Sequence, residues 1–178
     1  MLRNIQFHRL SQSTRGFTLI ELVIGMMVIG IAIVMLTSML FPQADRAAST
    51  LQRVRSAELA HSVMNEIWGK RYDQNTNPNG GVPACNAPIG IACTAASALG
   101  LDGESRDMFN DVDDYNGLDE DDNMLDSSQT YVQAYPRYQL QVTVSYLDSA
   151  TKAQKLITVD VTTPANEVIT YQAVRSNY

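Results

Sequence analysis

Acidic side chains crowd one part of the sequence and could bind a metal ion. Residues 102–126 hold eleven Asp and Glu side chains and a single base, Arg106. Calcium takes roughly six to eight oxygen ligands, often carboxylates, amides and backbone carbonyls, and this segment is rich in them. The EF-hand spacing is absent, because placing Gly117 sixth puts Val112 where the first acid is needed. Two interpretations stay open, a solvated acidic loop and an irregular calcium site. For the calcium site, the predicted ligands are Asp111, Asp113, Asp114 and Asn116, with residues 119–122 as a second group.

Two cysteines form a second set of residues that could be chemically reactive. Cys85 and Cys93 enclose a short loop and are the only cysteines in the chain. In an oxidising compartment they can form a disulfide, and the alternative is two unrelated thiols. A zinc site is not expected, because there is no second cysteine pair and both His8 and His61 are distant in sequence. The sequence also lacks a nucleophile elbow and a phosphate-binding glycine loop, so we expect no enzyme.

A single acid stands at the edge of a long apolar segment. Residues 22–41 carry no charge, and their only polar side chains are Thr37 and Ser38. Twenty helical residues span about 30 Å, which is the thickness of the hydrocarbon core of a bilayer. Glu21 directly precedes this segment, where an ionisable group is costly unless it finds a partner. Glu21 is therefore a candidate functional residue, and the alternative is a side chain that reaches the polar interface.

Charge differs sharply between the two sides of the apolar segment. The first sixteen residues contain Arg3, Arg9 and Arg15 but no acid, and the rest of the chain has a net charge of −9. Basic flanks favour the cytoplasmic side, so we expect a cytoplasmic N-terminus and an exported C-terminal part. An acidic exported domain would repel the nucleic-acid backbone, so we expect no nucleic-acid partner.

The residues around Gly16 resemble the class III signal of type IV prepilins. A basic leader, a glycine, a phenylalanine and a glutamate stand in family order before the apolar segment, in the string Arg15-Gly16-Phe17-Thr18-Leu19-Ile20-Glu21. A secretory signal would instead place its small residue after a shorter apolar core. The resemblance implies that a prepilin peptidase cuts between Gly16 and Phe17 and methylates the new N-terminus at Phe17. Glu21 would then be able to pair with the Phe17 amine during assembly.

This resemblance implies a structural subunit in the bacterial inner membrane and, after assembly, in a pilus. The implied partners are the prepilin peptidase, other pilins that contact the N-terminal helix, and the inner-membrane assembly platform. Residues 64–68 and 109–117 resemble minor pilins of the mannose-sensitive haemagglutinin (MSHA) pilus, which implies a scarce subunit that initiates or caps the filament. The alternatives are a minor pseudopilin of type II secretion and an uncut, membrane-tethered periplasmic binding domain.

The elements that position these residues are predicted to form an α+β fold. After a leader over residues 1–16, a membrane and assembly helix is expected over 17–42 and a periplasmic head over 43–178. The helix should bend or loosen at Pro42 and then continue over 43–73 as an amphipathic helix. Its predicted buried stripe consists of Ala44, Ala47, Ala48, Leu51, Val54, Ala60, Met64, Ile67 and Trp68.

The C-terminal part of the head has the alternating pattern of a β-sheet. Residues 74–136 are predicted to be irregular, and 137–178 to form the sheet. Alternation over 138–146 and 157–162 predicts two strands joined by a hairpin at 148–152, followed by a third strand at about 167–174. Three strands with one apolar face need a covering layer, which the amphipathic helix supplies.

Overall fold

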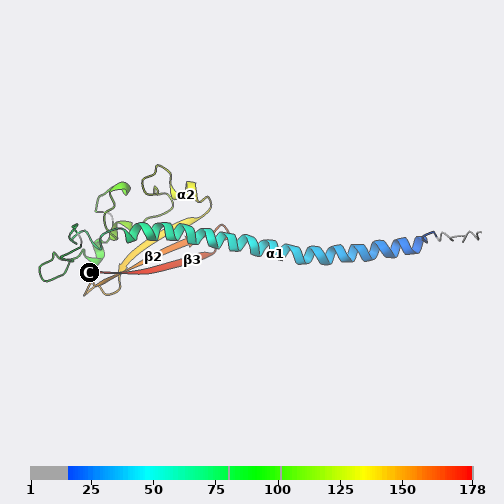
Figure 1. Ribbon diagram of the computed structural model, residues 1–178, viewed down its shortest axis with the longest axis horizontal. Helices are drawn as coiled ribbons and strands as arrows, with labels where there is room; N and C mark the ends of the chain where they lie inside the picture. Colours follow the sequence, from blue (N-terminus) through cyan, green and yellow to red (C-terminus); the bar gives the residue numbers. More distant parts are fainter. Residues whose placement is uncertain (1–15, 80, 101, 178) are drawn as a thin grey trace, which may run out of the picture. The chain divides into compact units, whose positions relative to one another are not determined.

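The computed structural model describes residues 16–79, 81–100 and 102–177 (Figure 1). The predicted leader, apart from Gly16, lies outside the described residues. The chain divides into two compact units, Met1–Arg46 and Ala47–Tyr178, and one long helix contributes to both. The elements are α1 (Leu19–Trp68), the 3-10 helices η1 (Ala96–Ala98), η2 (Arg106–Met108) and η3 (Asp113–Tyr115), α2 (Tyr131–Ala134), β1 (Gln139–Tyr146), β2 (Gln154–Thr162) and β3 (Val168–Ser176).

The first unit is helical, and its start is capped by a threonine. The carbonyl of Thr18 accepts hydrogen bonds from the backbone N–H groups of Glu21 (3.1 Å) and Leu22 (3.2 Å). The Thr18 hydroxyl also accepts from the Glu21 N–H (3.3 Å), as in one half of a capping box. Farther along, Thr37 and Ser38 donate their hydroxyls to helix carbonyls, so both polar groups are satisfied inside the apolar segment.

Helix α1 passes through Pro42 without interruption and ends at Trp68, slightly before its predicted end. Just beyond Trp68, the Arg71 N–H donates to the Asn110 carbonyl (3.3 Å), and the Arg71 carbonyl accepts from the Val112 N–H (3.0 Å). Bonds to a distant segment replace the helical bonds of Arg71, so the chain leaves the helix here.

The sheet is antiparallel with the order β1-β2-β3, which confirms the predicted α+β class (Figure 1). Val142 of β1 pairs with Val159 of β2, and Val144 pairs with Ile157, so apolar side chains of both strands share one face. Strand β2 begins at Gln154, earlier than predicted.

The outer edge of β1 is covered by a loop. Val142 donates its N–H to the Leu118 carbonyl and accepts from the Gly117 N–H, both at 2.9 Å. Two side chains accept hydrogen bonds that a neighbouring strand would otherwise accept. Asn116 Oδ1 accepts from the Val144 N–H (2.9 Å), and Glu120 Oε2 accepts from the Leu140 N–H (3.0 Å). The edge is therefore closed without a fourth strand among the described residues.

The face of α1 that packs on the sheet begins at Ser56, so the predicted stripe is wrong in its first half. Leu51 and Val54 are 68% and 61% exposed, and Trp68 is also exposed. Two residues along a helix correspond to a rotation of about 200° about its axis, so Val54 points to the side opposite Ser56. The buried residues of α1 are Ser56, Leu59, Ala60, Val63, Met64 and Ile67.

The segment predicted as irregular has little regular structure, yet it supplies part of the same core. Its buried apolar residues join those of α1 and the sheet in one cluster: Phe109, Val112, Tyr115, Leu118 and Tyr131. Asp111, Asp113 and Asp114 lie between them and are buried as well. The interpretation as a solvated acidic loop is therefore wrong for this stretch.

A buried lysine explains part of that burial. Lys155 lies on the inward face of β2 with Ile157 and is fully buried. Its Nζ donates to the Tyr72 carbonyl (2.7 Å), to Asp73 Oδ2 (3.1 Å) and, at short range, to Asp113 Oδ1. One cation thus links the end of α1, the acidic segment and the sheet. The alternation of β2, extended back to Gln154, would have placed Lys155 inward from sequence alone.

A second buried ion pair attaches the acidic segment to α1. Arg106 donates to both carboxylate oxygens of Glu66, at 2.6 and 2.8 Å. The Tyr115 hydroxyl donates to Glu66 Oε1 (2.6 Å), and the Arg106 guanidinium lies 4.9 Å from the centre of the Phe109 ring. Such bidentate pairs have a well-defined geometry, so they set the position of η2 against the helix.

Replacing Lys155 with methionine should destabilise the protein by about 3–5 kcal/mol, because two buried carboxylates lose their cation. Urea denaturation of the full chain in detergent measures the free energy of unfolding. The matched control is Lys152→Met, since the Lys152 ammonium group bonds the Cys93 carbonyl (3.0 Å) and lies near the Tyr146 ring but pairs with no carboxylate among the described residues. The loss of that hydrogen bond should cost about 1 kcal/mol. Equal effects of the two substitutions would contradict a dominant role for the buried ion pairs.

Candidate functional site

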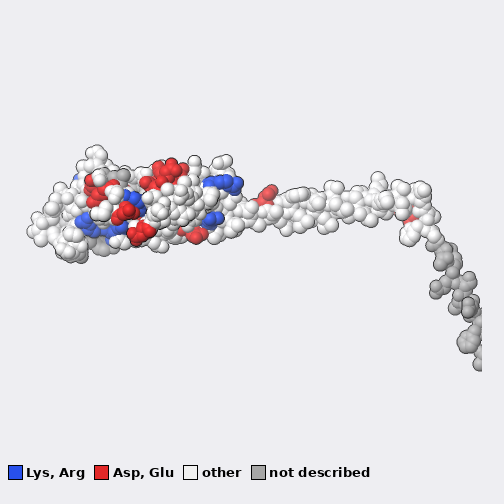
Figure 2. Space-filling view, turned by 90° about the horizontal axis from the view of Figure 1, so that it is seen from above, with Lys and Arg blue, Asp and Glu red and all other residues white. Residues whose placement is uncertain are grey.

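The N-terminal part of α1 presents apolar side chains outward along its length. Every large apolar residue from Leu19 to Phe41 is exposed, and Phe17 before them is 83% exposed. Figure 2 shows this part of the helix almost without charged side chains, whereas acidic and basic side chains are mixed over the visible face of the second unit. A contiguous apolar surface of this size marks contact with lipid or with other proteins.

The same helix meets the length and hydropathy requirements of a membrane span. Among the described residues, α1 is the one helix long and apolar enough to cross a bilayer. The polar groups within its apolar segment are satisfied by the helix itself, as a hydrocarbon environment requires.

Glu21 lies in the first turn of α1, in the position that the Thr18 cap defines. Glu21 is exposed, and its backbone N–H bonds Thr18. The free N–H groups and the macrodipole of a helix start favour a carboxylate. Thr18 was not identified as a helix cap from the sequence, although a threonine three residues before a glutamate is the signature of a capping box.

Gly16 and two glycines within α1 have open space around them in the described part of the chain. Apart from chain neighbours and the adjacent backbone of the same helix, a Cβ atom built on Gly16, Gly25 or Gly30 would meet no described atom within 4 Å. The fold itself therefore has no steric need for glycine at these positions. Any requirement for a small residue there must come from a molecule that binds the segment.

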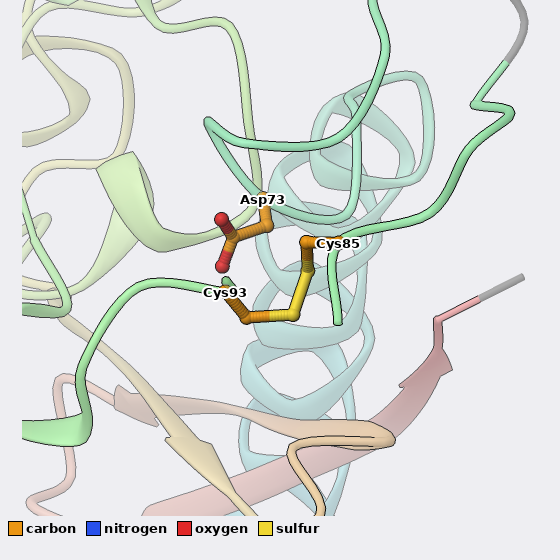
Figure 3. Close-up of side chains that lie close together, drawn as sticks. All are labelled: Asp73, Cys85 and Cys93. Atoms are coloured by element: carbon orange, nitrogen blue, oxygen red, sulfur yellow. A yellow bond between two sulfur atoms is a disulfide. The ribbon is translucent and has the colours of Figure 1, made fainter. Parts of the chain in front are cut away.

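Cys85 and Cys93 form a disulfide next to the Asp73 carboxylate (Figure 3). Asp73 accepts from the backbone N–H and the hydroxyl of Thr94 (3.1 Å each) and from the Tyr146 hydroxyl (3.1 Å). Burial alone would raise the pKa of Asp73, but Lys155 and the backbone N–H groups hold it below its usual range. With both sulfurs oxidised and Asp73 engaged, this cluster is structural and is not a metal site.

Two of the predicted calcium ligands are engaged by the fold. Asp113 pairs with Lys155. Asn116 uses its amide Nδ2 on the Leu99 carbonyl (3.0 Å) and its Oδ1 on the edge of β1. The structure therefore does not gather the four predicted residues around one point.

The second predicted group, residues 119–122, forms a turn. Asp122 Oδ2 accepts from the Asp119 N–H (2.9 Å), Asp119 Oδ1 accepts from the Asp121 N–H (2.9 Å), and Glu120 bonds the sheet edge. These carboxylates act as acceptors for backbone N–H groups.

Asp111 and Asp114, the other two predicted ligands, lie together with a residue that the sequence interpretation missed. Carboxylate oxygens of Asp102, Asp111 and Asp114 lie within 4.8 Å of one another. Burial, with the neighbouring carboxylates of Asp113 and Asp114, raises the pKa of Asp111 to about 8. Asp102 had no distinguishing sequence signal, because only the folding of the loop brings it close.

Comparison with protein families identifies the N-terminal segment. Residues 11–37 match the model of the prokaryotic N-terminal methylation motif. No curated protein and no solved structure matched the chain. The motif covers the junction at Gly16, Glu21 and most of the apolar surface of α1. Together with the long apolar helix and the small antiparallel sheet, this motif supports a type IV pilin- or pseudopilin-type subunit, and proteins of that type are structural subunits and not enzymes.

Proposed function

We propose that the chain is a minor pilin of a type IV pilus of the MSHA kind. The observation that carries the proposal is the exposed apolar surface of α1, uncharged over residues 22–41, which follows the Gly16–Phe17 junction and Glu21. Such a surface suits lipid, and it suits a bundle of like helices equally well. The same helix can therefore anchor the precursor in the inner membrane and later join the filament core.

The proposed topology follows from charge. The arginines before the apolar segment keep the N-terminus in the cytoplasm, and the acidic head lies in the periplasm. The prepilin peptidase then meets the Gly16–Phe17 junction at the cytoplasmic end of the helix, and the assembly platform meets the same end.

The proposed assembly contact joins Glu21 to the amine that cleavage creates on Phe17. The carboxylate lies in the first helical turn and is exposed, so it is accessible to a neighbouring subunit. In a low-dielectric filament core an unpaired carboxylate is costly, and a neighbour's amine removes that cost.

The MSHA kind is proposed from the sequence resemblance of two segments, and these segments also meet in the head. Residues 64–68 and 109–117 carry the sequence resemblance, and they share one core. Glu66 of the first segment accepts a hydrogen bond from Tyr115 of the second. The competing proposal is a minor pseudopilin of type II secretion. Deletion of the gene distinguishes them: loss of surface pili with normal protein secretion supports the pilin, and the reverse supports the pseudopilin.

Gly16→Val should leave the precursor uncut, because a branched side chain at the junction obstructs the peptidase. A side chain at Gly16 has open space among the described residues, so the fold should be unaffected. Gly25→Val is the matched control, since it is equally free of contacts but lies beyond the junction. Intact-mass measurement of membrane-extracted protein reports the loss of sixteen residues and the gain of one methyl group. Complete trimming of the Gly16 variant would contradict the proposal.

Glu21→Ala should permit membrane insertion and cleavage but reduce incorporation into filaments by roughly ten- to a hundredfold. That range corresponds to the loss of one charge-assisted hydrogen bond worth about 1.5–3 kcal/mol. Asp45→Ala removes another exposed acid from the same helix and serves as control. Immunoblots of sheared filaments, normalised to the membrane pool, give the incorporated fraction. Equal incorporation of both variants would argue against pairing at Glu21.

A further inference from the structure

The acidic segment of the head contains a cluster of carboxylates that the rest of the fold does not use fully. Asp102, Asp111 and Asp114 bring carboxylate oxygens within 4.8 Å of one another. Asp111 and Asp114 are only 1% and 2% exposed, whereas Asp102 reaches the surface. Ionised carboxylates so close together repel strongly where water is excluded.

Each buried carboxylate uses one oxygen within the fold. Asp114 Oδ2 accepts from the backbone N–H groups of Asn110 (2.7 Å) and Asp111 (3.0 Å). Asp111 Oδ1 accepts from the N–H groups of Asp113 (2.8 Å) and Asp114 (3.4 Å). These bonds fix the orientation of both side chains before any ligand arrives.

The other oxygen of each buried carboxylate is left without a donor. Asp111 Oδ2 and Asp114 Oδ1 are inaccessible to solvent and have no hydrogen-bond partner among the described residues. The neighbouring Asn110 shows the same imbalance, because its Nδ2 donates to both oxygens of Glu104 (2.7 Å each) while its Oδ1 has no partner. Buried acceptors without donors are unfavourable, so these atoms point to a bound cation independently of the number of acids.

We propose that Asp102, Asp111 and Asp114 bind a calcium ion. The donor set is oxygen only, which disfavours zinc, an ion that favours nitrogen and sulfur. Calcium tolerates irregular geometry, whereas magnesium demands a near-ideal octahedron. The two buried carboxylates supply fixed ligands, and the exposed position of Asp102 leaves one side open to water ligands.

Binding would connect the surface loop to the core. Asp102 lies before η2, and Asp111 and Asp114 enclose the two buried residues Val112 and Asp113. The ion would tie the loop to the segment that covers the edge of β1. This role does not depend on the filament to which the subunit belongs.

The test is calcium titration of the full chain purified in detergent. Calorimetry should show binding, and the midpoint of thermal unfolding should rise in calcium chloride relative to chelator. Magnesium chloride at the same concentration, and sodium chloride at matched ionic strength, should raise the midpoint much less.

Variants locate the ion. Asp102→Asn removes an exposed carboxylate and should weaken calcium affinity on the order of tenfold or more, since affinity follows ligand charge. Asp111→Asn should abolish the calcium-dependent shift, and without calcium its unfolding midpoint should equal or exceed that of the parent, because a buried repulsion is removed. Asp107→Asn changes an exposed acid of η2 outside the cluster and should bind calcium like the parent.

Three results would overturn the proposal. They are a parent protein whose unfolding midpoint does not respond to calcium, an equal response to magnesium or sodium chloride, and an Asp102→Asn variant that binds calcium as tightly as Asp107→Asn does.

Discussion

The head is organised around a positive charge that has been removed from water. Lys155 is fully buried, and its ammonium group bonds residues from two other parts of the chain: Tyr72 and Asp73 after α1, and Asp113 in η3. An unpaired ammonium group there would be costly, so the fold is stable only when the irregular segment places the Asp113 carboxylate against Lys155. The disulfide, the edge of β1 and the carboxylate cluster all lie in segments that this contact positions.

The two units differ in which side chains they bury and which they expose. In the head, charged groups such as Glu66 and Arg106 are buried and find partners within the chain. In the N-terminal helix, the large apolar groups are exposed, and Gly25 and Gly30 have open space beyond their own helix among the described residues. A protein that leaves this much apolar surface uncovered depends on lipid or on other subunits to cover it.

Sequence patterns predicted the elements whose signals are local. The uncharged segment after Glu21 indicated the helix, and the alternation around Val142 and Val159 indicated the sheet, because each pattern repeats with the period of its own structure. The helix face was partly wrong, since periodicity near Leu51 cannot show where the covering layer ends.

Contacts between distant segments left no such signal. Nothing near Asp102 marks it as a neighbour of Asp111, and the acidic run looked solvated because its cation, Lys155, is more than forty residues away. Counting charges along the chain detects their density but not their partners. The cysteine loop is an intermediate case, because two cysteines and an expected exported location indicated a disulfide without showing that it lies beside Asp73.

The covered edge of β1 also limits how this protein can associate through its sheet. Asn116 and Glu120 occupy hydrogen-bonding positions that another strand would need, and β3 is the opposite margin of the sheet. A sheet with one open side can accept one additional strand there, but stacking strands indefinitely requires two open sides. Copies of this protein at high local concentration are thus protected from growing into a continuous β-ribbon through their sheets.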